Sequence, residues 1–134
     1  MNSKTLLGVI LVLGIIDASY LTVIHFLPSA LVCPSVGGII NCKDVLTSSL
    51  SDVFGVPLAV AGLVWFIASL MMLEFGHNKI VKNIWMIIGV GGILYSITAQ
   101  AIIGKICIYC ATLDFLIALG VVMFIYFEAV LPKP

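Results

Sequence analysis

The stretch IWMIIGVGGILYSITAQAIIGKICIYCATLDFLIALGVVMFIYFEAVL, residues 84–131, decides the solvent in which the chain folds. It is long enough for two membrane-spanning helices, because about 20 apolar residues in a helix cross the roughly 30 Å of hydrocarbon in a bilayer. A Gly-Lys pair interrupts it, and a Cys-x-x-Cys motif, Cys107 and Cys110, follows at once. The stretch therefore predicts helices at residues 84–103 and 106–131, with two thiols beside the turn that joins them.

The composition of the whole chain also indicates a membrane protein. Of its 134 residues, 63% are hydrophobic and 9% are charged, and the mean hydropathy is +1.31. So few charges do not cover a soluble domain of this size. The formal net charge is zero and the six basic residues are all lysines, so we expect no nucleic-acid partner.

Two further apolar runs bring the predicted membrane-spanning helices to four, at residues 5–27, 57–75, 84–103 and 106–131. The first run is too long for the apolar core of a secretory signal and carries Asp17 in its middle, so we expect it to be retained. The predicted fold class is an all-α membrane protein. Its single domain, residues 1–134, is a bundle of four transmembrane helices.

The longest polar segment, residues 28–56, lies between the first two predicted spans. It holds the other two cysteines, Cys33 and Cys42, with proline and glycine residues that are typical of irregular backbone. Within it, KDVLTSSLSDVF, residues 43–54, places apolar residues on one helical face and serines and aspartates on the other. This pattern predicts a short half-helix at the membrane surface or across the end of the bundle.

The lysines predict the orientation of the bundle in the membrane. An even number of spans puts both termini on one side, together with four of the six lysines. The larger group is Lys4, Lys79, Lys82 and Lys133, and the smaller group is Lys43 and Lys105. Because lysine is enriched in cytoplasmic segments, we expect the termini in the cytoplasm. All four cysteines then gather at the outer face, where disulfides form and persist.

The cysteines form two pairs, Cys33 with Cys42 and Cys107 with Cys110. In thiol-disulfide exchange a thiolate attacks a sulfur, so a pair in an aqueous loop can collect electrons from a soluble protein and pass them to a pair fixed at a helix end. Such a helix end stabilises a thiolate. The sequence contains no haem, nucleotide or flavin motif, so the expected acceptor is a lipid quinone.

A quinone head group would lie among the helices near the outer face. We expect aromatic residues in the wall of its site. These are Phe54, Tyr95, Tyr109 and Phe115. The two tryptophans, Trp65 and Trp85, are interpreted instead as ordinary packing or lipid-facing residues.

Several short motifs together form a specific pattern. They are IDASYLT in the first span, the loop cysteines, NCKDVLTSSLSDVFGVPLAVAGL, and CIYC at the start of the fourth span. On these residues the chain resembles the vitamin K epoxide reductase family, in particular its bacterial and archaeal single-domain homologues, over almost its whole length.

The resemblance implies a role for each cysteine. Cys33 would exchange with a separate thioredoxin-like, DsbA-like protein. Cys42 would then pass electrons to Cys107. Cys110 would face the quinone, which would be of the menaquinone, ubiquinone or vitamin K type.

Two further positions take a role from the resemblance. Ser48 falls on the half-helix that supports the quinone site. Asp114 stands where vertebrate members have a tyrosine that binds a quinone carbonyl, and the apolar PLAVAGLVWF stands where they have an asparagine. These differences favour oxidation of protein thiols over epoxide reduction. The implied function is a quinone-dependent thiol-disulfide oxidoreductase among membrane lipids.

Three other interpretations remain open. A DsbB-type quinone oxidase also has four spans and two cysteine pairs, although its Cys-x-x-Cys usually lies in the first periplasmic region. A small membrane subunit could carry the cysteines as structural staples, which would stay oxidised and inert. A zinc site fits poorly, because structural zinc sites favour closely spaced pairs on both sides, so we expect no metal.

Overall fold

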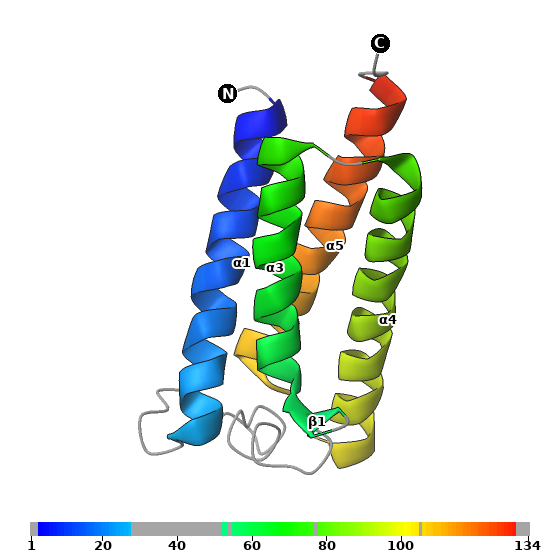
Figure 1. Ribbon diagram of the computed structural model, residues 1–134. Coiled ribbons are helices and arrows are strands. Elements are labelled where there is room, and N and C mark those ends of the chain that lie inside the picture. The colour runs from blue at the N-terminus through cyan, green and yellow to red at the C-terminus, as the bar shows by residue number, and fades with distance from the viewer. Residues whose placement is uncertain (1–2, 28–51, 54, 77, 105, 131–134) are drawn as a thin grey trace.

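The chain folds into long helices that run side by side along one axis (Figure 1). The computed structural model describes residues 3–27, 52–53, 55–76, 78–104 and 106–130. The helices are α1 (Ser3–Phe26), α3 (Leu58–Phe75), α4 (Lys79–Ile103) and α5 (Ile108–Val130), and a hairpin of β1 (Asp52–Val53) and β2 (Val56–Pro57) precedes α3. Within these residues four helices are long and apolar enough to cross a membrane, which confirms the predicted fold class.

The two ends of the bundle hold different segments of the chain. α1 begins and α5 ends at one end (Figure 1). The other end, which we call the cysteine end, holds the last turn of α1, the hairpin, the last turn of α4 and the first turn of α5. Residues 28–51 therefore join two elements that both lie at the cysteine end.

The outer surface of the helices is apolar. Phe75 is 83% exposed and Ile87 is 70% exposed, and large aliphatic side chains are exposed on every helix. A soluble protein rarely leaves so much contiguous apolar surface in water. The bundle is therefore a multi-pass membrane protein whose exposed side chains face lipid.

The third helix begins at Lys79 and not at residue 84 as predicted. The side chain of Asn78 accepts a hydrogen bond from the backbone N–H of Val81 at 2.8 Å, which caps the helix N-terminus. This cap lets the basic segment before residue 84 form the first turn of α4. The connection between α3 and α4 is correspondingly shorter than the sequence indicated.

The predicted half-helix does not extend to residue 54. Asp52–Val53 is a strand that pairs antiparallel with Val56–Pro57, with Asp52 opposite Pro57. Gly55, in the connection between the strands, has a φ of 80°, which favours glycine. The remainder of the predicted half-helix lies outside the described residues.

The core forms where α1 packs against α3 and α5. Leu7, Leu11, Ala18 and Leu21 recur at intervals of three to seven residues on one face of α1, and all four are buried. The ring of Phe66 on α3 is fully buried against this face. Gly14 of α1 permits that approach, because a Cβ atom there would overlap the Phe66 ring.

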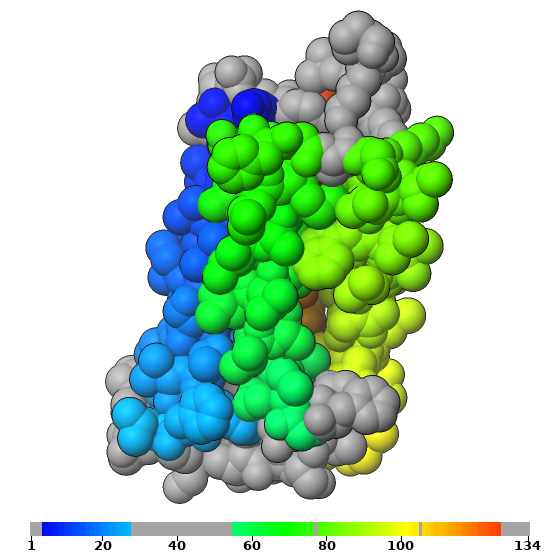
Figure 2. All heavy atoms as spheres, viewed as in Figure 1, coloured from blue at the N-terminus to red at the C-terminus, as the bar shows by residue number. Residues whose placement is uncertain are grey.

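The remaining helix, α4, packs mainly against α5 and has few contacts with α3. Figure 2 shows a gap between α3 and α4 through which atoms of α5 are visible. We call this opening the α3–α4 gap. Because the outer surface faces lipid, the gap opens toward the bilayer.

A tryptophan pair bridges α3 and α4 across part of this gap. The rings of Trp65 and Trp85 stack with centroids 6.4 Å apart. The indole N–H of Trp65 donates to the Trp85 carbonyl oxygen at 3.1 Å, and that of Trp85 donates to Ser69 Oγ at 2.9 Å. The Ser69 hydroxyl donates in turn to the Trp65 carbonyl oxygen at 2.6 Å. Both indole N–H groups are thus paired where no water is available.

Replacement of Gly14 by alanine tests the close approach of α1 and α3. Gly14→Ala should lower the free energy of unfolding by about 1–3 kcal/mol, because the added methyl group overlaps a buried ring. Gly8→Ala is the matched control, since a Cβ at Gly8 meets no atom within 4 Å. Thermal unfolding in one detergent compares the two variants. Equal melting temperatures for both variants would contradict the packing of α1 against Phe66.

Candidate redox site

The turn between α4 and α5 places the Cys-x-x-Cys motif at a helix N-terminus. Gly104 ends α4 in the left-handed region with a φ of 77°, and its N–H donates to the Gln100 carbonyl oxygen at 2.9 Å. α5 begins at Ile108, so Cys107 occupies the N-cap position. Its Sγ accepts a hydrogen bond from the backbone N–H of Cys110 at 3.4 Å, in the way that a serine or threonine oxygen usually caps a helix.

The two thiols are free and differ in their surroundings. The side chain of Cys107 is fully buried, whereas that of Cys110 is partly exposed. A hydrogen bond from the Cys110 side chain, with backbone N–H groups of Cys110 and Tyr109, lowers the pKa of the Cys107 thiol. Burial and the charge of Asp17 oppose this shift but do not cancel it. Cys107 is therefore the thiol of the pair that ionises more readily than an ordinary cysteine.

A chain of hydrogen bonds links Cys107 to a buried carboxyl group. The backbone N–H of Cys107 donates to Gln100 Oε1 at 2.8 Å. Gln100 Nε2 lies 3.4 Å from Ser96 Oγ and 3.5 Å from the Ser96 carbonyl oxygen. Ser96 hydrogen-bonds the side chain of Asp114. Within the described part of the chain, Asp114 Oδ2 is buried and has no hydrogen-bond partner.

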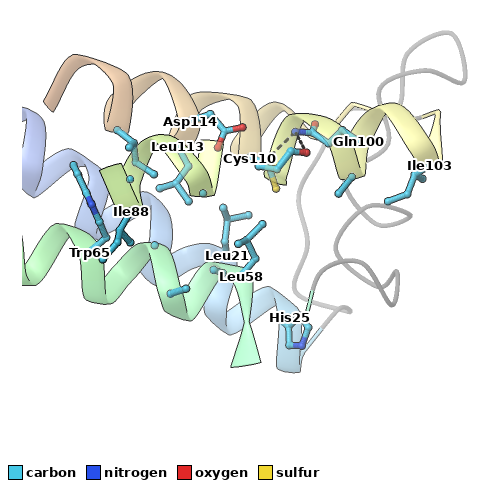
Figure 3. Close-up of a pocket in the computed structure, with 18 of the residues that line it drawn as sticks. Leu21, His25, Leu58, Trp65, Ile88, Gln100, Ile103, Cys110, Leu113 and Asp114 are labelled. Atoms are coloured by element: carbon cyan, nitrogen blue, oxygen red, sulfur yellow. Dashed lines mark hydrogen bonds between the residues drawn. The ribbon is translucent and has the colours of Figure 1, made fainter. Parts of the chain in front are cut away.

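A cavity of about 150 Å³ lies between α3, α4 and α5, with Leu21 and His25 of α1 on its remaining side. Most of its walls are aliphatic or aromatic. Among the described residues, its polar lining consists of His25, Ser96, Gln100, Cys110 and Asp114, together with the two indoles. Figure 3 shows Cys110, Asp114 and Gln100 on one wall, with Leu21 and Leu58 opposite. Cys107 does not line the cavity.

Of the residues that the sequence suggested for the quinone site, some line the cavity and others do not. Asp114 lines the cavity, one helical turn beyond Cys110. Tyr95, Tyr109 and Phe115 do not line it. Phe115 is 63% exposed on the outside of α5, and the Tyr109 ring packs on Tyr20 of α1 at a centroid distance of 5.0 Å.

Several predicted residues lie outside the described part of the chain. They are Cys33, Cys42, Ser48 and Phe54. Among the residues that the structure does describe, no group of three or more His, Cys, Asp or Glu side chains is placed to hold a metal ion.

Several cavity residues were missed from the sequence, among them three large polar or aromatic side chains. Trp65 and Trp85 were assigned to ordinary packing, but both line the cavity. Gln100 was not singled out, although it is the only amide side chain within the third predicted span. A buried amide in a membrane helix needs partners, and that rule could have identified it.

Comparisons with known proteins identify the family of the chain. The chain matches the model of the Vitamin K epoxide reductase family over residues 5–126. It therefore belongs to that family, as the resemblance of its motifs implied.

Two relatives are similar over about three quarters of the chain. The chain is 30% identical over 115 residues to the thiol-disulfide oxidoreductase LTO1 of Arabidopsis thaliana, in an alignment that covers 75% of this chain and 30% of that protein. It is 35% identical over 99 residues to an uncharacterized protein of Archaeoglobus fulgidus, which covers 74% of this chain and 76% of the relative. The chain thus spans less than a third of the length of the Arabidopsis protein. No solved structure matches the chain.

The lowered pKa of Cys107 gives a test of the helix-end geometry. With Cys33 and Cys42 replaced by alanine, alkylation of reduced Cys107 should be half-maximal at a pH below the ordinary cysteine value of about 8.5. Cys110→Ala should raise that midpoint, because it removes the largest stabilising interaction of the thiolate. Mass spectrometry of the labelled protein measures both midpoints. The assay runs from about pH 5 to about pH 10, a range that brackets the ordinary cysteine pKa. An unchanged midpoint in Cys110→Ala would show that the Cys110 side chain does not stabilise the Cys107 thiolate.

Proposed function

We propose that the chain is a quinone-dependent thiol-disulfide oxidoreductase that oxidises a thioredoxin-like partner. The observation that carries this proposal is the division of the Cys-x-x-Cys pair. Cys110 opens into the apolar cavity, whereas Cys107 lies outside it with its backbone bound to Gln100. One thiol can therefore face an acceptor from the membrane while the other exchanges with a second cysteine pair.

The cavity fits a small quinone ring. Ligand sites of this kind are mostly apolar and hold a few polar groups that orient the ligand. The unpaired Oδ2 of Asp114 and the amide of Gln100 supply such groups beside Cys110. A bound quinone would accept two electrons and two protons, the number that one dithiol releases when it becomes a disulfide.

The second cysteine pair completes the route for electrons. A partner dithiol would reduce the disulfide of Cys33 and Cys42, and Cys42 would then exchange with Cys107. Residues 28–51 connect α1 to β1, and the last turn of α1, β1 and the first turn of α5 all lie at the cysteine end (Figure 1). This connectivity supports a shared location for both pairs, which we assign to the outer face of the membrane, with the termini in the cytoplasm.

The activity in the name of the Arabidopsis relative supports the same chemistry. That protein is called a thiol-disulfide oxidoreductase, and 75% of this chain aligns with it. The partner and the quinone are inferred from the cysteine arrangement and the cavity.

An anaerobic assay tests the proposed function. Reduced protein is freed of reductant and mixed with decylubiquinone, whose fully substituted ring does not add thiols. We expect quinone absorbance and free thiols to fall together in a one-to-one ratio of quinone to dithiol. If no quinone is reduced and the thiols persist, the proposed quinone-dependent reaction is wrong.

The cysteine variants separate the two halves of the route. Cys110→Ala should abolish quinone reduction, but Cys33 and Cys42 should still exchange with a thioredoxin-like protein. The double variant Cys33→Ala/Cys42→Ala should reduce quinone in a single turnover but should not oxidise the partner. Retained quinone reduction in Cys110→Ala would remove Cys110 from its assigned role.

Two adjacent glycines of α4 test whether the cavity holds the quinone. Gly92 lines the cavity and Gly91 is exposed outside it, and a Cβ at either position meets no atom within 4 Å. Gly92→Leu should fill the cavity and weaken quinone binding by about tenfold, since overpacking costs about 1–3 kcal/mol. Gly91→Leu should bind quinone as the wild type does. The apparent KM for decylubiquinone measures the difference, and equal values would place the quinone elsewhere.

A further inference from the structure

The orientation of the Gln100 amide is determined by its hydrogen bonds. A backbone N–H can only donate, so the atom that it meets at 2.8 Å from Cys107 must be the amide oxygen of Gln100. The NH₂ group therefore points to the opposite side. That side carries Ser96, which lines the cavity, whereas Cys107 does not. The donor end of the amide thus lies beside Ser96, a lining residue of the cavity, and the acceptor end lies beside the cysteine turn.

The two ends of the amide are not equally well paired. The oxygen makes one short bond to Cys107, whereas the NH₂ group, among the residues that the structure describes, has only the two contacts to Ser96, at 3.4 and 3.5 Å. Hydrogen bonds of this type have an optimum near 2.9 to 3.0 Å, so both contacts are weak. Gln100 is itself only 9% exposed. A buried amide donor with weak partners has an unused capacity to bond an acceptor atom in the cavity.

We propose that Gln100 binds a carbonyl oxygen of the quinone through its NH₂ group while its oxygen holds the backbone of Cys107. This inference rests on the proposed quinone function. A ring bonded in this way would lie on the wall that carries Cys110 and Asp114 (Figure 3). The planar amide of Gln100 would then hold both the quinone and the turn that carries the thiols. Its two ends would set the distance between the quinone and that turn.

The chain contains its own probe of the cavity. Its two tryptophans, Trp65 and Trp85, both line the cavity, so a bound quinone, which is an electron acceptor, should quench the intrinsic fluorescence, and durene binding is measured by its displacement of the quinone. Oxidised protein is titrated with duroquinone, which it cannot reduce, and with durene, which is the same tetramethyl ring without carbonyl groups. The pair of probes separates a hydrogen bond to the carbonyl from simple packing of the ring.

Replacement of Gln100 by methionine is the main test. Gln100→Met should weaken duroquinone binding by about 3- to 10-fold, the range expected for one lost hydrogen bond, and should leave durene binding unchanged. Thr98→Val, an exposed position on the same helix, should bind both probes as the wild type does. Equal loss of both probes, or no loss of either, would overturn the role of Gln100.

Gln100→Glu gives a second test that does not depend on the folding of the methionine variant. A carboxyl group keeps the size of the side chain and an oxygen for Cys107, but it can donate only when protonated. The affinity of this variant for duroquinone should therefore fall as the pH rises, relative to the wild type. His25, Cys110 and Asp114 also line the cavity and are the same in both proteins, so they do not contribute to the difference. Parallel pH profiles would count against the inference.

The outcome also separates this inference from the proposed function. If the wild type reduces decylubiquinone and binds duroquinone but the Gln100 variants behave identically, the function stands and the role of Gln100 fails. If the wild type binds neither quinone, the proposed function fails and this inference fails with it.

Discussion

The structure depends on one constraint, which is that a polar group in a bilayer must find its partner inside the protein. The backbone meets this constraint by forming helices. The few polar side chains meet it by clustering, as the indoles of Trp65 and Trp85 do with Ser69. The cluster of Gln100, Ser96 and Asp114 satisfies the constraint only in part, because Asp114 Oδ2 is unpaired among the described residues and the amide donor is weakly bonded. These incompletely paired groups line the cavity, which is why we propose that a ligand binds there.

The first turn of α5 gives the two thiols of the Cys-x-x-Cys motif different surroundings. Cys107 is the N-cap residue, and Cys110 follows three positions later on the same turn. The backbone N–H of Cys110 bonds the sulfur of Cys107, while the side chain of Cys110 lines the cavity. The thiols are thus close enough to share a hydrogen bond and yet meet different surroundings.

The sequence predicted the helices well, because the length of an apolar run is a direct measure of a membrane span. It predicted the cavity poorly for a related reason. Each helix is apolar on nearly every side, so its pattern does not mark which face packs inward and which meets lipid. Phe115 and Trp65 were equally plausible as site residues by type, yet Phe115 faces outward and Trp65 lines the cavity. Only the packing of the helices could separate them.

The polar positions were more informative than the aromatic ones. Asp114 was identified from its place four residues after Cys110, and it lines the cavity. Gln100 could have been identified by the same reasoning, because an amide in an apolar span is costly unless it is bonded. The early start of α4 was also encoded locally, in the capping side chain of Asn78. The hairpin at β1 and β2 was not, because its pairing depends on the turn at Gly55 rather than on apolar periodicity.

Because the α3–α4 gap opens toward the bilayer, the occupancy of the cavity depends on the concentration of a ligand in the membrane and not on its concentration in solution. For a molecule that enters from the bilayer, the relevant concentration is its ratio to lipid and not its amount per litre of solution. Each methylene group of a lipid tail adds about 0.8 kcal/mol to its preference for the membrane, so a long-tailed molecule is enriched there by many orders of magnitude. A cavity that opens to lipid can therefore work with a weak intrinsic affinity and release its product just as readily. Dilution into excess detergent would empty it without any change in the protein.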